Sequence, residues 1–301
     1  MNIYLVNLNL QVMGYSSYSS DSRSIRAEAM SYDTNSVEEN FKSRSIQSAM
    51  NPTGLKLRES RDSDAHPNSV AIIIALDVTG SMLSVPQEMV KEGLPTIMST
   101  IIQGGTPDPQ VLFLGIGDHE CDKSPLQVGQ FESGDEELDM WLTQIYLERG
   151  GGSNDGESYM LAWYTAAFHT SIDCLEKRGQ KGFLFTIGDE PVLPRIYASS
   201  LKKIFGDGQY QDWKTTDLLA RAQEKYNVFH IHTRETGTGR RWDSEEKWKE
   251  LLGQNLIVVE NHTEIPHKIA EIVSKNTTEI PITIKANDET HKDDIDDIKM
   301  L

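Results

Sequence analysis

Short runs of apolar residues, each ending in polar residues or glycine, divide the middle of the chain. The runs cover residues 71–76, 111–116, 183–187, 228–231 and 256–259. The first has the length and the β-branched content of a strand buried on both faces of a parallel sheet. A shorter run at 126–131 follows the second closely enough to return antiparallel at the sheet edge. These runs therefore predict the strands of one sheet.

Segments with helical periodicity lie between the predicted strands. Apolar residues recur at helical spacing around residues 94–103, 138–145, 159–175, 200–205, 216–226, 244–252 and 263–274. Ser133 and Glu136 form a capping-box pattern at the start of the second helix. The segment 159–175 is apolar nearly all round, which predicts a buried helix. Strands alternating with helices predict an α/β fold with a Rossmann-like, doubly wound, mostly parallel sheet and one antiparallel edge strand.

Both ends of the chain lack this pattern. Residues 14–69 are rich in Ser, Asp, Glu, Arg and Asn, which predicts an extended or partly disordered arm with a short helix near 36–49. Such an arm could order against a partner or wrap its own domain. The final residues are acidic. We therefore divide the chain into an N-terminal arm (1–69), one domain (70–275) and an acidic C-terminal tail (276–301).

Composition narrows the classes of function. The chain has 301 residues and a net charge of -17, so a nucleic-acid backbone is not an expected partner. Cys121 and Cys174 are too few for a disulfide framework or a zinc ribbon. No apolar run approaches the roughly 18 residues of a membrane span, and the first residues lack a signal-peptide pattern. We expect a cytoplasmic protein with no membrane partner.

The strongest chemical signal is the turn after the first predicted strand. Asp77, Thr79 and Ser81 place one carboxylate and two hydroxyls on this turn, at the strand end where open α/β sheets bind ligands. Hard oxygen donors suit Mg²⁺, Mn²⁺ or Ca²⁺ better than zinc or copper. The same residue types also cap helices, and a single turn of this kind is more often a helix cap than a ligand site.

Two later turns carry similar donors. Ser153 follows three glycines at 150–152, which allow the backbone to approach an ion closely, and Asp189 ends the third predicted strand. Because these turns fall at the same edge of the predicted sheet, we expect their oxygens to converge on one cation. The alternatives to Ser153 as the ligand from the second turn are Asn154, Asp155 and Glu157.

The sequence Asp-Val-Thr-Gly-Ser-Met at 77–82 resembles the metal-ion-dependent adhesion site of von Willebrand factor A-type (VWA) domains. The order of motifs extends the resemblance over residues 70–274. It implies a VWA fold in which Mg²⁺, or alternatively Mn²⁺ or Ca²⁺, keeps an open position for the Asp or Glu carboxylate of a protein partner. The implied ligands, acting directly or through water, are Asp77, Thr79, Ser81, Ser153 and Asp189. Thr79 and Ser153 stand where the family commonly has Ser and Thr.

The wider motif pattern is similar to uncharacterised bacterial and bacteriophage proteins of the VWA type. This resemblance implies a protein–protein interaction module in an intracellular or phage-associated assembly. A virion structural or assembly protein, capable of self-association, is an alternative that the residues leave open.

A metal-dependent phosphatase is the alternative from a different class. Residues 117–122 match the G-D-x-x-x-D turn of haloacid-dehalogenase-like phosphatases, with Asp77 as the nucleophile. That chemistry needs a second carboxylate two residues after the nucleophile, where this chain has Thr79. We therefore expect binding without catalysis, with Asp118 and His119 forming a polar rim beside the ion.

Two further patterns carry weaker signals. His230 and His232 share one face of a predicted strand, which suits a metal pair, but the sequence places no third ligand. Residues 237–241 resemble a phosphate loop only superficially, because no Lys-Ser or Lys-Thr follows. Arg240 and Arg241 in this segment could contact an acidic partner or the chain's own acidic tail.

Overall fold

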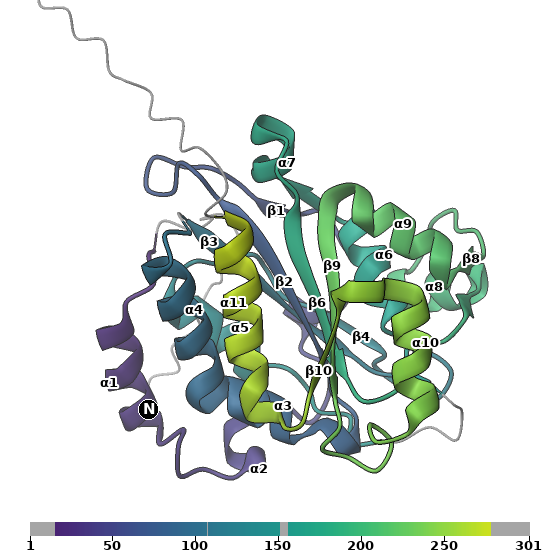
Figure 1. Ribbon diagram of the computed structural model, residues 1–301, viewed down its shortest axis with the longest axis horizontal. Helices are drawn as coiled ribbons and strands as arrows, with labels where there is room; N and C mark the ends of the chain where they lie inside the picture. The colour runs from purple at the N-terminus through teal and green to yellow at the C-terminus, as the bar shows by residue number, and fades with distance from the viewer. Residues whose placement is uncertain (1–15, 107, 151–155, 278–301) are drawn as a thin grey trace, which may run out of the picture.

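A central sheet with helices on both faces organises the molecule (Figure 1). The computed structural model describes residues 16–106, 108–150 and 156–277. Within them the sheet has six strands in the order β10-β9-β6-β2-β3-β4, all parallel except β4 against β3. The strands are β2 (Val70–Asp77), β3 (Pro109–Ile116), β4 (Leu126–Val128), β6 (Gly182–Gly188), β9 (Tyr226–Thr233) and β10 (Leu256–Val259). The predicted Rossmann-like, doubly wound sheet with an antiparallel edge strand is confirmed.

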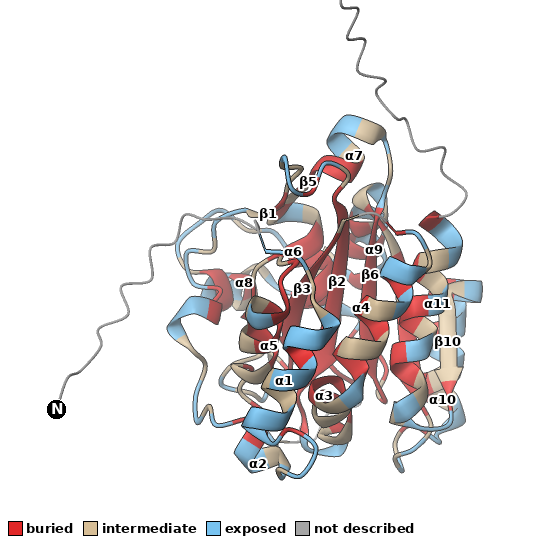
Figure 2. Ribbon diagram, turned by 90° about the vertical axis from the view of Figure 1, so that its left-hand side faces the viewer, coloured by how far each residue is buried: buried red, intermediate tan, exposed pale blue. Residues whose placement is uncertain are grey.

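The helices form two layers that bury opposite faces of β2. Ile72, Ile74 and Leu76 belong to one apolar cluster, and Ala71, Ile73 and Ala75 to the other. The first layer contains α3 (Ser84–Glu88), the π-helical turn η3 (Met89–Gly93), α4 (Leu94–Gln103), α5 (Asp135–Thr143) and α11 (Ile265–Thr277). The second contains α6 (Met160–Phe168), α7 (Asp173–Arg178), α8 (Ala198–Phe205), α9 (Thr215–Lys225) and α10 (Trp242–Leu252). Figure 2 shows the buried sheet between the layers.

Short elements complete the described chain. Two small sheets pair β1 (Arg58–Ser60) with β5 (Thr170–Ile172) and β7 (Arg195–Ile196) with β8 (Trp213–Lys214). The 3₁₀ turns are η1 (Ser48–Met50), η2 (Gly80–Met82), η4 (Gly253–Asn255) and η5 (His262–Glu264). No helix of the described residues combines the length and the apolar character needed to cross a membrane.

The structure corrects two predicted helix boundaries. The helix predicted over 159–175 ends at Phe168, because β5 follows it and pairs with β1 of the arm. This pairing joins residues far apart in sequence, so helical periodicity could not reveal it. The capping box at Ser133 does not form, since Gly134 is the N-cap of α5 and the Ser133 hydroxyl has no hydrogen-bond partner in the described structure.

The described part of the arm, residues 16–69, wraps the domain. The helix α1 (Ser20–Met30) lies against α4 and α5. Its buried Arg23 pairs with Asp139 of α5 at 2.7 Å and donates to the Val90 carbonyl. The helix expected near 36–49 is limited to α2 (Val37–Asn40) and η1. The boundary between arm and domain stays a prediction.

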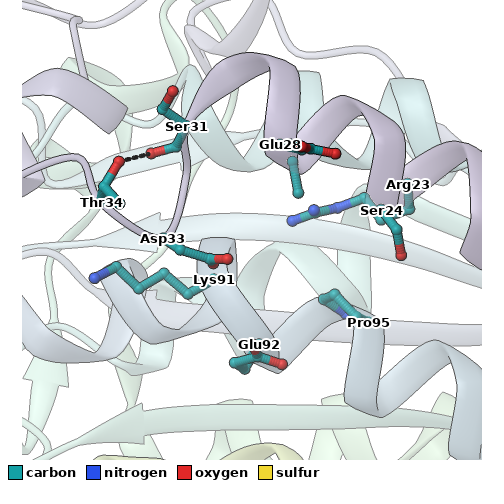
Figure 3. A pocket seen from close by; sticks show the side chains of 10 residues that line it. Arg23, Ser24, Glu28, Ser31, Asp33, Thr34, Lys91, Glu92 and Pro95 are labelled. Atoms are coloured by element: carbon teal, nitrogen blue, oxygen red, sulfur yellow. Dashed lines mark hydrogen bonds between the residues drawn. The ribbon is translucent and has the colours of Figure 1, made fainter.

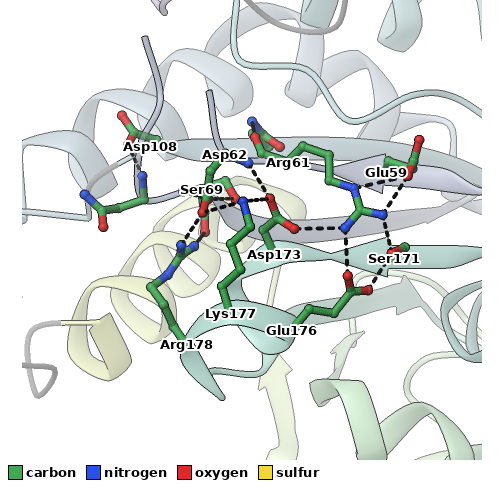
Figure 4. A network of polar contacts seen from close by, with 12 residues as sticks. Glu59, Arg61, Asp62, Ser69, Asp108, Ser171, Asp173, Glu176, Lys177 and Arg178 are labelled. Carbon is green, nitrogen blue, oxygen red and sulfur yellow. Dashed lines mark hydrogen bonds and ion pairs between the residues drawn. The ribbon is translucent and has the colours of Figure 1, made fainter. Parts of the chain in front are cut away.

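A network of ion pairs and hydrogen bonds holds the end of the arm beside β5 (Figure 4). The Arg61 guanidinium donates to Glu59, Asp173 and Glu176. Burial raises the pKa of Asp173, but bonds from Lys177, the Asp62 backbone and Arg61 outweigh it and lower that pKa to about 2. The Asp173 carboxylate therefore stays ionised and holds the arm at neutral pH.

Replacement of Arg23 tests the docking of the arm. We expect Arg23→Met to lower the free energy of unfolding by about 3 kcal/mol, because it removes the closer and more buried of the two arginines, Arg23 and Arg26, that pair with the buried Asp139 carboxylate. The double variant Arg23→Met with Asp139→Leu should recover most of that loss, since no buried charge then remains at Asp139. Urea unfolding of both variants measures the difference.

Arg221→Met is the control, because Arg221 and Glu224 form an exposed pair worth less than about 1 kcal/mol. If Arg23→Met unfolded like this control, the arm would not be docked through Arg23.

Candidate metal-binding site

The first turn holds Asp77 in a fixed orientation at the end of β2. Asp77 is only 1% exposed, and its Oδ1 accepts from the Thr79 backbone N–H at 2.9 Å and the Thr79 hydroxyl at 2.5 Å. The following 3₁₀ turn begins at Gly80, and neither it nor α3 has a side-chain cap. Asp77 is therefore not a helix cap.

The third turn brings Asp189 to the first. Asp189 follows β6, the strand that pairs with β2, and is fully buried. The Ser81 hydroxyl donates to Asp189 Oδ1 at 3.4 Å, and the Thr236 hydroxyl donates to Oδ2 at 2.5 Å. The structure thus brings together Asp77, Thr79, Ser81 and Asp189, four of the five residues predicted as ligands.

The fifth predicted ligand, Ser153, lies outside the described residues, together with Asn154 and Asp155. The described flanks of this second turn contact the first turn. Gly80 N–H donates to the Gly150 carbonyl at 3.0 Å, and a Cβ added at Gly80 would lie 3.1 Å from the Arg149 carbonyl oxygen. Ser153 stays a prediction as a ligand.

Tyr159 is a site residue that sequence reasoning missed. Its buried hydroxyl donates to Asp77 Oδ2 at 2.6 Å, although the sequence indicates only a position in an apolar helix. The ring passes so close to Gly188 that a Cβ there would overlap the Tyr159 hydroxyl. The only sequence signal is therefore the glycine before Asp189. Thr236 was missed in the same way, because a single threonine in a loop carries no pattern.

Among the described residues, carboxylates gather at the site and raise one another's pKa. Burial, together with Asp189, raises the pKa of Asp77 to about 7, against the lowering effect of the Thr79 and Tyr159 hydrogen bonds. Burial and the charges of Asp77, Glu190 and other nearby carboxylates raise the pKa of Glu157 to about 10. Glu157 is 3% exposed, and its Oε2 has no hydrogen-bond partner in the described structure. Protons or a cation must therefore offset this charge.

The acidic turn after β3 lies beside this cluster. Asp118 is buried, and the neighbouring His119 contacts the Ser158 hydroxyl through its backbone N–H at 2.9 Å and its ring Nδ1 at 2.7 Å. Ser158 precedes Tyr159 in the chain, so the turn borders the carboxylate site. The role of Asp118 and His119 as a polar rim beside an ion stays a prediction, and both side chains are buried here.

His230 and His232 are packed side chains in the described structure. The His230 ring stacks on Trp248 at 3.6 Å, and its Nδ1 is 2.9 Å from the Thr186 hydroxyl. His232 Nε2 is 2.8 Å from the Gly239 carbonyl oxygen. Burial lowers the pKa of both rings. Over residues 16–106, 108–150 and 156–277, no group of three His, Cys, Asp or Glu side chains is arranged to hold a metal.

A cavity with charged walls is formed by residues other than those of the candidate site. It has a volume of about 370 Å³, lies under α1, and is lined by Arg23, Glu28, Asp33, Lys91 and Glu92 among others (Figure 3). A second cavity of about 360 Å³ is bordered by His119 and Lys203. Neither has Asp77 or Asp189 in its wall.

No protein-family model matches the sequence, and no match is found among curated proteins. Similar solved structures include the pilus adhesin SpaC from Lactobacillus rhamnosus GG, with 11% identity and a TM-score of 0.46 over 72% of this chain. They also include the conserved hypothetical protein BatB from Bacteroides thetaiotaomicron, with 15% identity and a TM-score of 0.42 over 70% of this chain and 100% of BatB. This chain matches only 31% of the SpaC chain.

The raised pKa of Asp77 predicts how the metal-free protein responds to pH. An acid whose folded pKa exceeds its unfolded value contributes stability at low pH, which is lost as the pH rises through about 7. We therefore expect Asp77→Asn to stabilise the chelated protein at pH 8 by a few kcal/mol, since one pKa unit corresponds to about 1.4 kcal/mol. The gain should disappear near pH 4.

Asparagine suits this comparison because its oxygen can accept from Thr79 and its amide can face the Tyr159 hydroxyl. Thermal unfolding in EDTA at both pH values measures the effect. Equal stability of the two proteins at pH 8 would contradict a charge conflict at Asp77.

Proposed function

We propose that this chain is a VWA-like interaction module that binds a divalent cation, Mg²⁺ first, and through it a carboxylate of a protein partner. Asp77, Thr79, Ser81 and Asp189 would hold the ion directly or through water, with Ser153 as the candidate from the second turn. The observation that carries the proposal is the 3.4 Å contact between Ser81 and Asp189, which joins the first and third turns.

The charges of the site support this proposal. Asp77 and Asp189 are buried at the ends of neighbouring strands, and the Asp189 charge raises the pKa of Asp77. A bound cation would reverse that effect and favour the ionised form of both groups. The buried Glu157 Oε2, unpartnered within the described residues, is a further oxygen in this cluster. Two carboxylates with hydroxyls match the preference of Mg²⁺ for oxygen donors.

A bound cation also explains why an acidic protein would bind an acidic side chain. The net charge of -17 repels carboxylates at long range. A divalent ion with one open coordination position supplies a local positive charge that outweighs this repulsion at contact. In this proposal the side chains bind and orient the ion, and they catalyse no reaction.

We propose that the site does not catalyse phosphoester hydrolysis. The position two residues after Asp77 carries the Thr79 hydroxyl, which donates to Asp77 itself. A threonine there cannot serve as the general acid that an aspartyl-phosphate mechanism needs. Incubation with p-nitrophenyl phosphate and Mg²⁺ should release no product above the Asp77→Asn background.

Titration calorimetry tests metal binding directly. We expect the full chain to bind Mg²⁺ or Mn²⁺ at pH 7.5, and Asp77→Ala and Asp189→Ala each to abolish the heat of binding. The affinity should fall as the pH drops below about 7, because protonation of Asp77 then competes with the ion.

Glu132→Gln is the matched control. Burial raises the pKa of Glu132 to about 7 as well, but this residue pairs with Val111 at the far end of β3, so its loss should leave metal binding unchanged. Absence of metal uptake by the intact protein at neutral pH would end the proposal.

A further inference from the structure

The loop between β9 and α10 is tied to the proposed metal site by one hydroxyl. Thr236 Oγ1 donates to Asp189 Oδ2 at 2.5 Å and accepts from the Gly239 N–H at 2.9 Å. A Cβ at Gly239 would overlap the Thr233 carbonyl oxygen, so the tight turn requires glycine at this position. The residue after Gly239 is therefore held at the border of the site.

That residue, Arg240, carries a positive charge that no carboxylate offsets within the described structure. Its Nη1 donates to the backbone carbonyls of Arg234 at 3.2 Å and Glu235 at 2.7 Å. In contrast, Arg234 pairs with Glu245 and Glu260. Arg240 is exposed, so the other donors of its guanidinium remain accessible to a ligand.

Trp242 lies close by on the same edge of the molecule. It is the first residue of α10 and is 79% exposed, more than any other large apolar side chain of the described residues. Figure 1 places the start of α10 at the same edge of the sheet as α3, which follows Asp77. Exposed Trp and Arg residues are the types most enriched among the strong contacts of protein interfaces.

We propose that Arg240 and Trp242 bind the partner segment that flanks the metal-bound carboxylate. Arg240 would take a second carboxylate, and Trp242 an apolar side chain. The planar guanidinium matches a carboxylate bidentately. An acidic segment needs such local positive charge because the chain as a whole is strongly acidic. The partner is thus a protein segment with at least two acidic residues and an apolar one. This inference rests on the proposed function.

Binding of short peptides to the full chain tests the inference. The probes are fluorescein-labelled peptides with one Asp and one Leu, compared with peptides that carry an added Glu one, two or three positions after the Asp. Fluorescence anisotropy in excess Mg²⁺ should show that one doubly acidic peptide binds roughly three- to ten-fold more tightly than the singly acidic one. Arg240→Gln should abolish this difference in affinity. Trp242→Ala should weaken the binding of both peptides.

Arg241→Gln is the matched control. Arg241 already pairs with Asp243 at 3.0 Å, so this substitution should leave the preference for the doubly acidic peptide intact. If Arg240→Gln and Arg241→Gln reduced the preference for the doubly acidic peptide equally, the assignment of Arg240 as the carboxylate-binding residue would be overturned. So would a failure of every peptide to bind to protein that takes up Mg²⁺ by calorimetry. Absence of Mg²⁺ uptake by the unchanged protein would instead identify a failure of the proposed function.

The acidic tail of the chain is a competing occupant that the same assay can detect. The test variant is the full chain with Asp→Asn at positions 293, 294, 296 and 297. Unchanged peptide affinity supports a separate protein partner. Tighter binding that depends on Arg240 would show that the tail occupies the surface and would overturn the partner assignment.

Discussion

The placement of two buried carboxylates at the ends of adjacent strands is the constraint on which the site depends. Asp77 ends β2 and Asp189 follows β6, and these two strands pair in parallel, so the sheet itself sets the two groups close together. Burying like charges in this way is unfavourable unless protons, hydrogen bonds or a cation offset them. The hydroxyls of Thr79, Tyr159 and Thr236 supply the hydrogen bonds. These hydrogen bonds do not neutralise the negative charge of the carboxylates, which a proton or a cation must balance.

The placement of the site at one edge of the sheet could be predicted, because it depends on strands that are clear in the sequence. Each core strand is an apolar run, and a mostly parallel sheet necessarily gathers the carboxyl ends of its strands at one edge. That reasoning was enough to bring Asp77 and Asp189 together. It could not assign Ser153, where the glycine-rich segment offers several oxygen donors at nearly equal positions.

The features that sequence reasoning missed depend on contacts between distant segments. Tyr159 counts as an apolar residue in a helical pattern, and only the sheet shows that its hydroxyl reaches Asp77 past Gly188. The end of α6 is set by pairing of β5 with β1 of the arm, not by a local helix-breaking residue. Composition predicted an extended or partly disordered arm, because singly scattered residues such as Arg23 give no sign of the buried ion pair that docks it.

The arm contacts the candidate site as well as α4, α5 and β5. Glu38 of α2 pairs with Arg149 at 2.8 Å, and Arg149 adopts a left-handed backbone conformation with φ of 58°. The next residue, Gly150, accepts the hydrogen bond from Gly80 in the first turn. The ion pair with Glu38 therefore connects the arm to the entry of the second turn, where Arg149 adopts this uncommon backbone conformation. The arm and the carboxylate site are therefore parts of one packed unit.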